Sequence, residues 1–147
     1  MTPFRRSWHA AGLALGILAG VHAAGPASAC VCAEPSPEVA YARAAIVFAG
    51  TVVGIEQPLS QWLGLSSSGD RLVRFTVTRR WKGVPGASEI VRALLAGEAC
   101  GYPFREGETY LVYAVGTFER RTGICDGTKE LSIAEKDVQV LDALSGK

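Results

Sequence analysis

Four cysteines constrain the fold of this 147-residue chain more than any other feature. They are Cys30, Cys32, Cys100 and Cys125, so two lie almost together and two lie far along the chain. An even number of cysteines in a small exported domain indicates a disulfide framework, and the spacing does not resemble a structural zinc motif. A bridge between Cys30 and Cys32 would close a very small, strained ring. The chain therefore has either the bridges Cys30–Cys100 and Cys32–Cys125 or the bridges Cys30–Cys125 and Cys32–Cys100.

The first 29 residues have the three-part pattern of a secretory signal peptide. Two arginines near the start precede an apolar run over residues 10–24, and Ala27-Ser28-Ala29 forms a small-residue cleavage site. The apolar run is shorter than the about 20 residues that span a bilayer, which argues against an uncleaved membrane anchor. We therefore expect cleavage after Ala29, one domain over residues 30–147 that begins at Cys30 and has no transmembrane span, and a secreted or periplasmic protein.

Two alternatives to ordinary secretion stay open. A cysteine directly after the cut can be acylated, which would make the protein a lipid-anchored envelope protein, although Ala27 stands where such sites usually have leucine. An acylated Cys30 could neither form a disulfide nor present a free α-amine. The pair Arg5-Arg6 could start a twin-arginine signal, but the flanking residues match such a signal weakly.

The residues after the leader lack the groups that several kinds of chemistry need. Residues 30–147 carry 13 basic and 14 acidic side chains, without the basic excess of a nucleic-acid-binding domain. Both histidines lie in the leader, so a Ser-His-Asp or Cys-His nucleophile would have no base. Carboxylates such as Glu98, Glu106 and Glu108 do not form a recognisable pair for general acid–base catalysis. We expect a binding protein with no catalytic residues and no cofactor of its own, rather than an enzyme.

The apolar pattern predicts a mainly β domain with short terminal helices, packed as a small barrel. Ser36, Pro37 and Glu38 indicate the start of a helix that runs to about Ala45, and helical spacing of apolar residues indicates a second helix over residues 134–144. Strands are expected over residues 46–53, 71–81, 89–95 and 109–115, with a further short piece over 131–133.

Two details of this pattern can be checked against a structure. Residues 71–81 alternate, so Val73, Phe75, Val77 and Trp81 are expected on one apolar face. Residues 57–70 form a loop in which Trp62 and Leu65 either cover the barrel or form a contact edge.

Short motifs in a fixed order carry a family resemblance. Cys30-Val31-Cys32-Ala33-Glu34-Pro35 at a new N-terminus is the most specific of them. It is followed by Ala44–Val52, Phe75-Thr76-Val77, Trp81-Lys82-Gly83, Cys100-Gly101-Tyr102, Gly107–Val112 and Cys125. In this order the chain resembles the tissue inhibitors of metalloproteinases (TIMPs) and the wider netrin-like domain over nearly all of residues 30–147.

The resemblance implies an OB-type five-stranded barrel with bridges Cys30–Cys100 and Cys32–Cys125. It implies that the α-amine and carbonyl of Cys30 chelate the catalytic zinc of a target metalloprotease. An α-amine has a pKa near neutrality, so a fraction of it is free to bind metal. It also implies that Val31 enters the primary specificity pocket, that Cys32, Ala33, Glu34 and Pro35 lie along the cleft, and that Cys100 and Gly101 flank them.

The expected partner is therefore a zinc metalloprotease, whose own zinc is the only metal involved. The alternative is a non-inhibitory netrin-like module that binds another exported protein, with the loop around Trp62 as a candidate contact. The sequence gives no sign of oligomerisation, and a monomer is expected.

Overall fold

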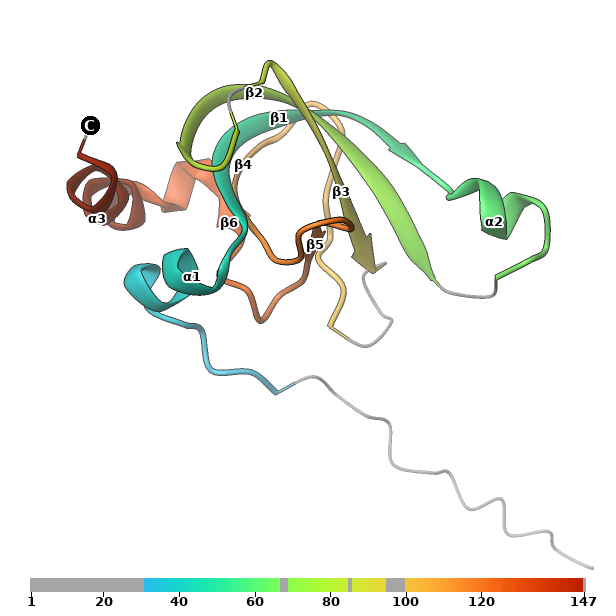
Figure 1. Ribbon diagram of the computed structural model, residues 1–147, viewed down its shortest axis with the longest axis horizontal. Helices are drawn as coiled ribbons and strands as arrows, with labels where there is room; N and C mark the ends of the chain where they lie inside the picture. Colours follow the sequence, from blue (N-terminus) through green and yellow to red (C-terminus); the bar gives the residue numbers. More distant parts are fainter. Residues whose placement is uncertain (1–30, 67–68, 85, 95–99, 147) are drawn as a thin grey trace, which may run out of the picture.

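Figure 1 shows the computed structural model, which describes residues 31–66, 69–84, 86–94 and 100–146. The expected leader, Cys30 and the end of the expected third strand at Leu95 lie outside these residues. The elements, in chain order, are α1 (Pro37–Arg43), β1 (Ile46–Glu56), α2 (Leu59–Trp62), β2 (Asp70–Lys82), β3 (Ser88–Leu94), β4 (Thr109–Ala114), β5 (Arg121–Thr122), β6 (Lys129–Glu130), the 3-10 helix η1 (Leu131–Ile133) and α3 (Glu135–Ser145).

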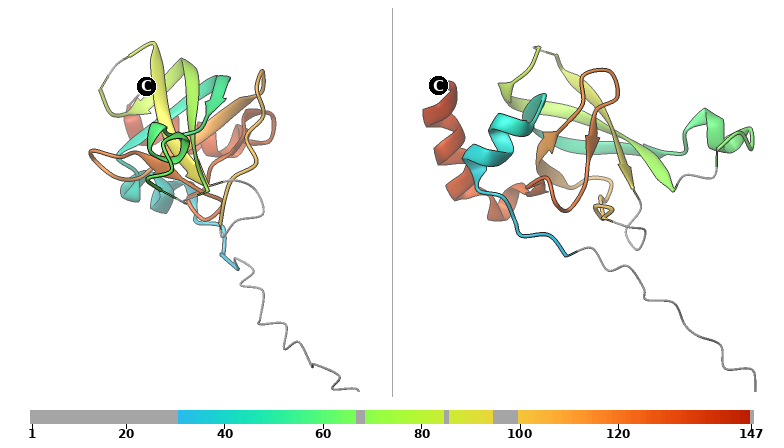
Figure 2. Two further views of the ribbon diagram at one scale, coloured as in Figure 1. Left: turned by 90° about the vertical axis from the view of Figure 1, so that its right-hand side faces the viewer. Right: turned by 60° about the horizontal axis from the view of Figure 1, so that its bottom comes forward.

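The strands form one curled sheet in the order β5-β3-β2-β1-β4-β6. The pairs β1–β2, β2–β3, β1–β4 and β4–β6 are antiparallel, whereas β3 and β5 are parallel. An additional bridge joins Val115, just after β4, to Arg121 of β5, with two backbone hydrogen bonds of 2.8 Å. The β5 end of the sheet thereby approaches β4, and the sheet curls into a half-barrel (Figure 2).

Side chains alternate across the sheet and build two cores. The core inside the curl gathers alternate residues of β1 to β4, among them Phe48, Phe75 and Val112. The second core lies between the outer face of the sheet and the helices α1 and α3, and it contains Leu111 and Leu141. In β4, which lies within the range expected for the fourth strand, Tyr110, Val112 and Ala114 all face the inner core.

A bulge reverses the alternation of β2 and makes one expectation wrong. Val73 and Phe75 face the inner core as expected, and Val77 packs against it, but Trp81 belongs to the outer core. The pairing with β1 passes from Gly50↔Val77 to Ala49↔Arg79, so Thr78 is an extra residue on β2. An extra residue exchanges the two faces of the strand beyond it. The arginine at position 80, opposite Phe48, therefore faces inward instead of Trp81.

The remaining differences concern short elements. The sheet has six strands among the described residues, whereas the resemblance implies five. Two of the six, β5 and β6, have only two residues each and were not expected from the sequence. Residues 131–133, expected as a short strand, form η1. The expected loop after β1 contains α2, whose Trp62 is 73% exposed, so this residue does not cover the barrel. The mainly β class with short helices is confirmed.

Candidate functional site

The candidate site is the N-terminal segment, residues 31–36, which runs in non-repetitive conformation to the start of α1. Ser36 is the N-cap of α1, as expected, and its side chain accepts a hydrogen bond from Val39 N at 3.4 Å. Val31, at the outer end of the described segment, is 95% exposed. Nearly the whole side chain of this valine is exposed, whereas most apolar side chains of its size in the described residues are at least partly buried.

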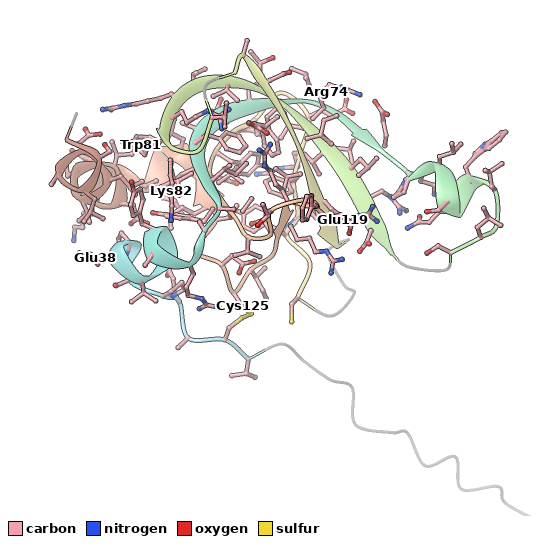
Figure 3. The ribbon with its side chains drawn as sticks, in the orientation of Figure 1. Glu38, Arg74, Trp81, Lys82, Glu119 and Cys125 are labelled. Carbon is pink, nitrogen blue, oxygen red and sulfur yellow. A yellow bond between two sulfur atoms is a disulfide. The ribbon has the colours of Figure 1, made fainter. Side chains whose placement is uncertain are left out.

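A disulfide fastens this segment to a distant part of the chain. Cys32 is bonded to Cys125 with a Cα–Cα distance of 5.4 Å, across 93 residues of sequence. Figure 3 shows Cys125 where the N-terminal segment passes the body of the domain. Of the two open pairings, this bond is the one that the resemblance implies for Cys32.

Pro35 packs against Gly127, which follows the disulfide loop. The backbone of Gly127 has φ +89°, a conformation that favours glycine. A Cβ at this position would lie 3.4 Å from Pro35 Cγ and 3.2 Å from Ala40 Cβ, closer than side chains usually pack. The glycine therefore lets the N-terminal segment and α1 approach the loop that carries Cys125.

An ion pair holds the segment at a third point. Lys129 Nζ lies 2.9 Å from Asp137 Oδ2 and also donates a short hydrogen bond to Glu34 Oε1. Burial alone would lower the pKa of Lys129, but the two carboxylates together raise it above its ordinary value. Tyr113 donates its hydroxyl hydrogen bond to the same Asp137 at 3.4 Å, and burial, followed by the charge of Asp137, raises the pKa of this tyrosine. Glu34 is therefore turned toward the body rather than toward the exposed end.

The Cys100–Gly101 loop adjoins the loop that carries Cys125. Cys100 O accepts a hydrogen bond from Ile124 N at 3.1 Å, and a Cβ on Gly123 would lie only 2.5 Å from the same oxygen. Cys100 itself adopts a left-handed conformation with φ 67°. None of the cysteines in the described part of the chain is a free thiol. The expected bond between Cys100 and Cys30 lies outside the described residues and stays a prediction.

Aromatic rings support this loop from inside the barrel. The ring centroids of Tyr102 and Phe104 lie 4.6 Å apart with the rings tilted by 46°, and both rings contact Tyr110 of β4 edge to face. Phe104 continues the contact to Phe75 of β2 at 5.3 Å. The loop that carries Cys100 is thus anchored to the inner core just beyond the cysteine.

A shallow groove of about 440 Å³ runs beside the N-terminal segment. It is lined by Cys32 and Glu34 of the segment and by residues that follow Gly123, among them Ile124 and Ile133. Both isoleucines are exposed, Ile133 at 74%. No pattern in the sequence singles out these two residues or Lys129, since the fold and the Cys32–Cys125 bond bring them next to the N-terminal segment.

The structure brings together most of the residues that the sequence singled out. Cys32, Ala33, Glu34 and Pro35 form one continuous segment, Val31 projects from it, and Cys100 and buried Gly101 lie next to the loop of Cys125. Cys30, the residue expected to bind the metal of a partner, lies outside the described residues, as does Glu98. Glu106 accepts a hydrogen bond from Ile55 N at 3.1 Å and therefore has a structural contact.

Two features are absent from the residues that the structure describes. No cluster of three or more histidine, cysteine, aspartate or glutamate side chains there could hold a metal ion. No helix within the described ranges has the length and apolar character needed to cross a membrane. Comparison of the sequence with protein-family models and with curated proteins found no match.

Proposed function

We propose that this protein is an exported, TIMP-like inhibitor of zinc metalloendopeptidases that acts through its N-terminal segment. The observation that carries the proposal is the fastening of residues 32–35 to the body at three points, with Val31 left 95% exposed beyond them. A segment whose conformation is fixed before binding loses little conformational entropy when it enters a cleft. A rigid, projecting end is the geometry that such an inhibitor needs.

The fold supports the same proposal. Five strands follow one another around the barrel as β1, β2, β3, β5 and β4, because β5 pairs with β3 and is bridged to the end of β4. A five-stranded, partly open barrel is the architecture of the OB type that the resemblance implies. The two-residue β6 is an addition at the edge of β4.

The proposed mechanism requires a mature chain that starts at Cys30. Its α-amine and carbonyl oxygen would then bind the catalytic zinc of the target, with Val31 in the primary specificity pocket. Cys32 to Pro35 would lie along the cleft, and the Cys100–Gly101 loop would contact one wall beside them. The bond between Cys30 and Cys100 would fix the amine at the zinc-facing end. The protein itself would contribute no metal.

Replacement of Val31 tests the contact on which affinity depends. Val31→Gly removes one apolar side chain from the proposed pocket and should weaken inhibition by about 1.5–3 kcal/mol, at least about tenfold in Ki. Val84→Gly is the matched control, since Val84 is 74% exposed on the β2–β3 turn. Ki would be measured against a panel of zinc endopeptidases. The proposal is contradicted if Val31→Gly and Val84→Gly inhibit equally well. It is also contradicted if neither the parent protein nor either variant inhibits any of the proteases.

A further inference from the structure

The β1–β2 hairpin carries an apolar tip that the proposed inhibitory segment does not use. Four large side chains at this tip are mostly exposed: Leu59 at 67%, Trp62 at 73%, Leu63 at 52% and Leu65 at 78%. Figure 1 and the right-hand view of Figure 2 show α2 projecting from the sheet at the end remote from α1 and α3. We call residues 59–65 the hairpin tip.

The hairpin tip is ordered by polar contacts on its inner side. Gln61 Nε2 donates a hydrogen bond to Asp70 O at 3.0 Å, and Gln61 Oε1 accepts one from Arg71 Nη1 at 3.1 Å. The backbone adds bonds from Leu63 N to Leu59 O at 2.9 Å and from Leu65 N to Ser60 O at 2.8 Å. Its polar glutamine thus faces the protein while its leucines and tryptophan face outward. That is the reverse of a loop that covers a core.

The charge pattern fits a lipid surface. Residues 57–69 contain no charged side chain, so the tip can leave water without burying a charge. At its base, Arg74, Arg92 and Arg121 are balanced by their ion-pair partners Glu56, Asp70 and Glu119. Arg71, which hydrogen-bonds to Gln61 Oε1 and to Asp70 O, adds one positive charge there. Tryptophan favours the interface of a bilayer, leucine favours its acyl region, and arginines close to the surface are attracted to anionic headgroups.

We propose that the hairpin tip inserts into the surface of a bilayer that contains anionic lipid, and so holds the exported protein at a membrane. The insertion is peripheral, since one helical turn and its flanking loop reach only the boundary between headgroups and acyl chains. This inference stands on the tip alone and does not depend on the proposed inhibition, because the N-terminal segment lies elsewhere on the molecule (Figure 1).

The test uses the processed protein, with a mass that shows a start at Cys30 and no lipid adduct. It is mixed with vesicles of phosphatidylcholine and phosphatidylglycerol. Trp62 is exposed and Trp81 is 5% exposed, so a blue shift of emission and quenching by brominated lipid would report on the hairpin tip. We expect both signals, together with co-sedimentation of the protein with the vesicles.

Variants identify the contact. Leu59→Ser/Leu65→Ser keeps the tryptophan reporter and should reduce vesicle partitioning at least about tenfold. Phe118→Ser is the control, since Phe118 is fully exposed on the loop between β4 and β5. Absence of co-sedimentation, or equal partitioning of both variants, overturns the proposal. The proposal is also overturned if the protein does not bind the vesicles and instead self-associates through the hairpin tip in sedimentation velocity without lipid.

Discussion

Glu89 joins three parts of the barrel through one buried carboxylate. Its side chain on β3 is 8% exposed and lies 2.7 Å from Arg80 Nη2 of β2, and it also accepts a short hydrogen bond from Arg120, just before β5. Glu89→Gln keeps the shape and removes the charge that faces both arginines. Loss of one partner from a buried ion pair is strongly destabilising, so the free energy of unfolding should fall by about 3 kcal/mol in urea denaturation.

Glu56→Gln is the matched control for that change. Glu56 also pairs with an arginine, Arg74 at 3.4 Å, but both side chains are about half exposed. Exposed pairs contribute below about 1 kcal/mol, because water and salt screen them. Equal losses of stability for Glu56→Gln and Glu89→Gln would show that the buried carboxylate has no special part in closing the barrel.

Tyrosine ionisation should set the alkaline limit of stability. Burial, followed by the neighbouring Tyr110, raises the pKa of Tyr102 from 10.0 to about 12. The unfolded chain loses this proton near pH 10 and the folded chain does not, so the stabilisation is complete below pH 10 and is lost as the pH rises from 10 to 12. Unfolding free energies across this range should therefore decline, with a shallower decline for Tyr102→Phe. A decline of the same slope in both proteins would refute this assignment.

Among the elements, the N-terminal segment depends on β6 as well as on its disulfide. Lys129 of β6 pairs with Glu34 of the segment and with Asp137 of α3. Lys129→Met keeps the aliphatic stem but removes both pairs, so NMR order parameters of residues 33 and 34 should fall toward values typical of a flexible loop. Lys136→Met on the exposed face of α3 is the control and should leave them unchanged. Unchanged order parameters in Lys129→Met would mean that the disulfide alone positions the segment.

The long elements could be predicted from the sequence because their apolar patterns are long. The strands β1 to β4 and the helices α1 and α3 each exist where they were expected, because the strands and α3 have long apolar patterns and Ser36, Pro37 and Glu38 mark the start of α1. β5 and β6 have only two residues each, too few for any period, and they exist only because β3 and β4 offer edges. The prediction of the face on which Trp81 lies was wrong for another reason. The bulge at Thr78 depends on pairing with β1, which no local pattern encodes.

The candidate site could likewise be predicted only in part from the sequence. The cysteine spacing predicted only that Cys32 pairs with Cys100 or with Cys125, because two cysteines so close together must pair elsewhere, and the family resemblance implied the bond to Cys125 that the structure has. The contacts of Lys129, Ile124 and Ile133 with the groove could not be predicted, since they follow from a bond across 93 residues. Glu34 was expected along the cleft, and its pairing with Lys129 likewise required the three-dimensional structure.

For the whole molecule, the Cys32–Cys125 bond links the first described residues to the last third of the chain. Closing a loop of 93 residues removes a large part of the conformational freedom of the unfolded chain. The double change Cys32→Ser/Cys125→Ser should lower the free energy of unfolding by about 4.6 kcal/mol on the chain-entropy account, as measured by urea denaturation. A loss below about 1 kcal/mol would show that the bond orients the N-terminal segment without stabilising the domain.

The position of the chain start tests the proposed function most directly. Two proteins would be compared, one that begins at Cys30 and one with a single alanine placed before it, each with an intact mass that shows both disulfides and no lipid. Inhibition of a panel of zinc endopeptidases would be measured for both. The account predicts inhibition by the first and its loss in the second, because the added residue displaces the α-amine from the zinc. Equal inhibition by the two proteins, or none by either, would contradict it.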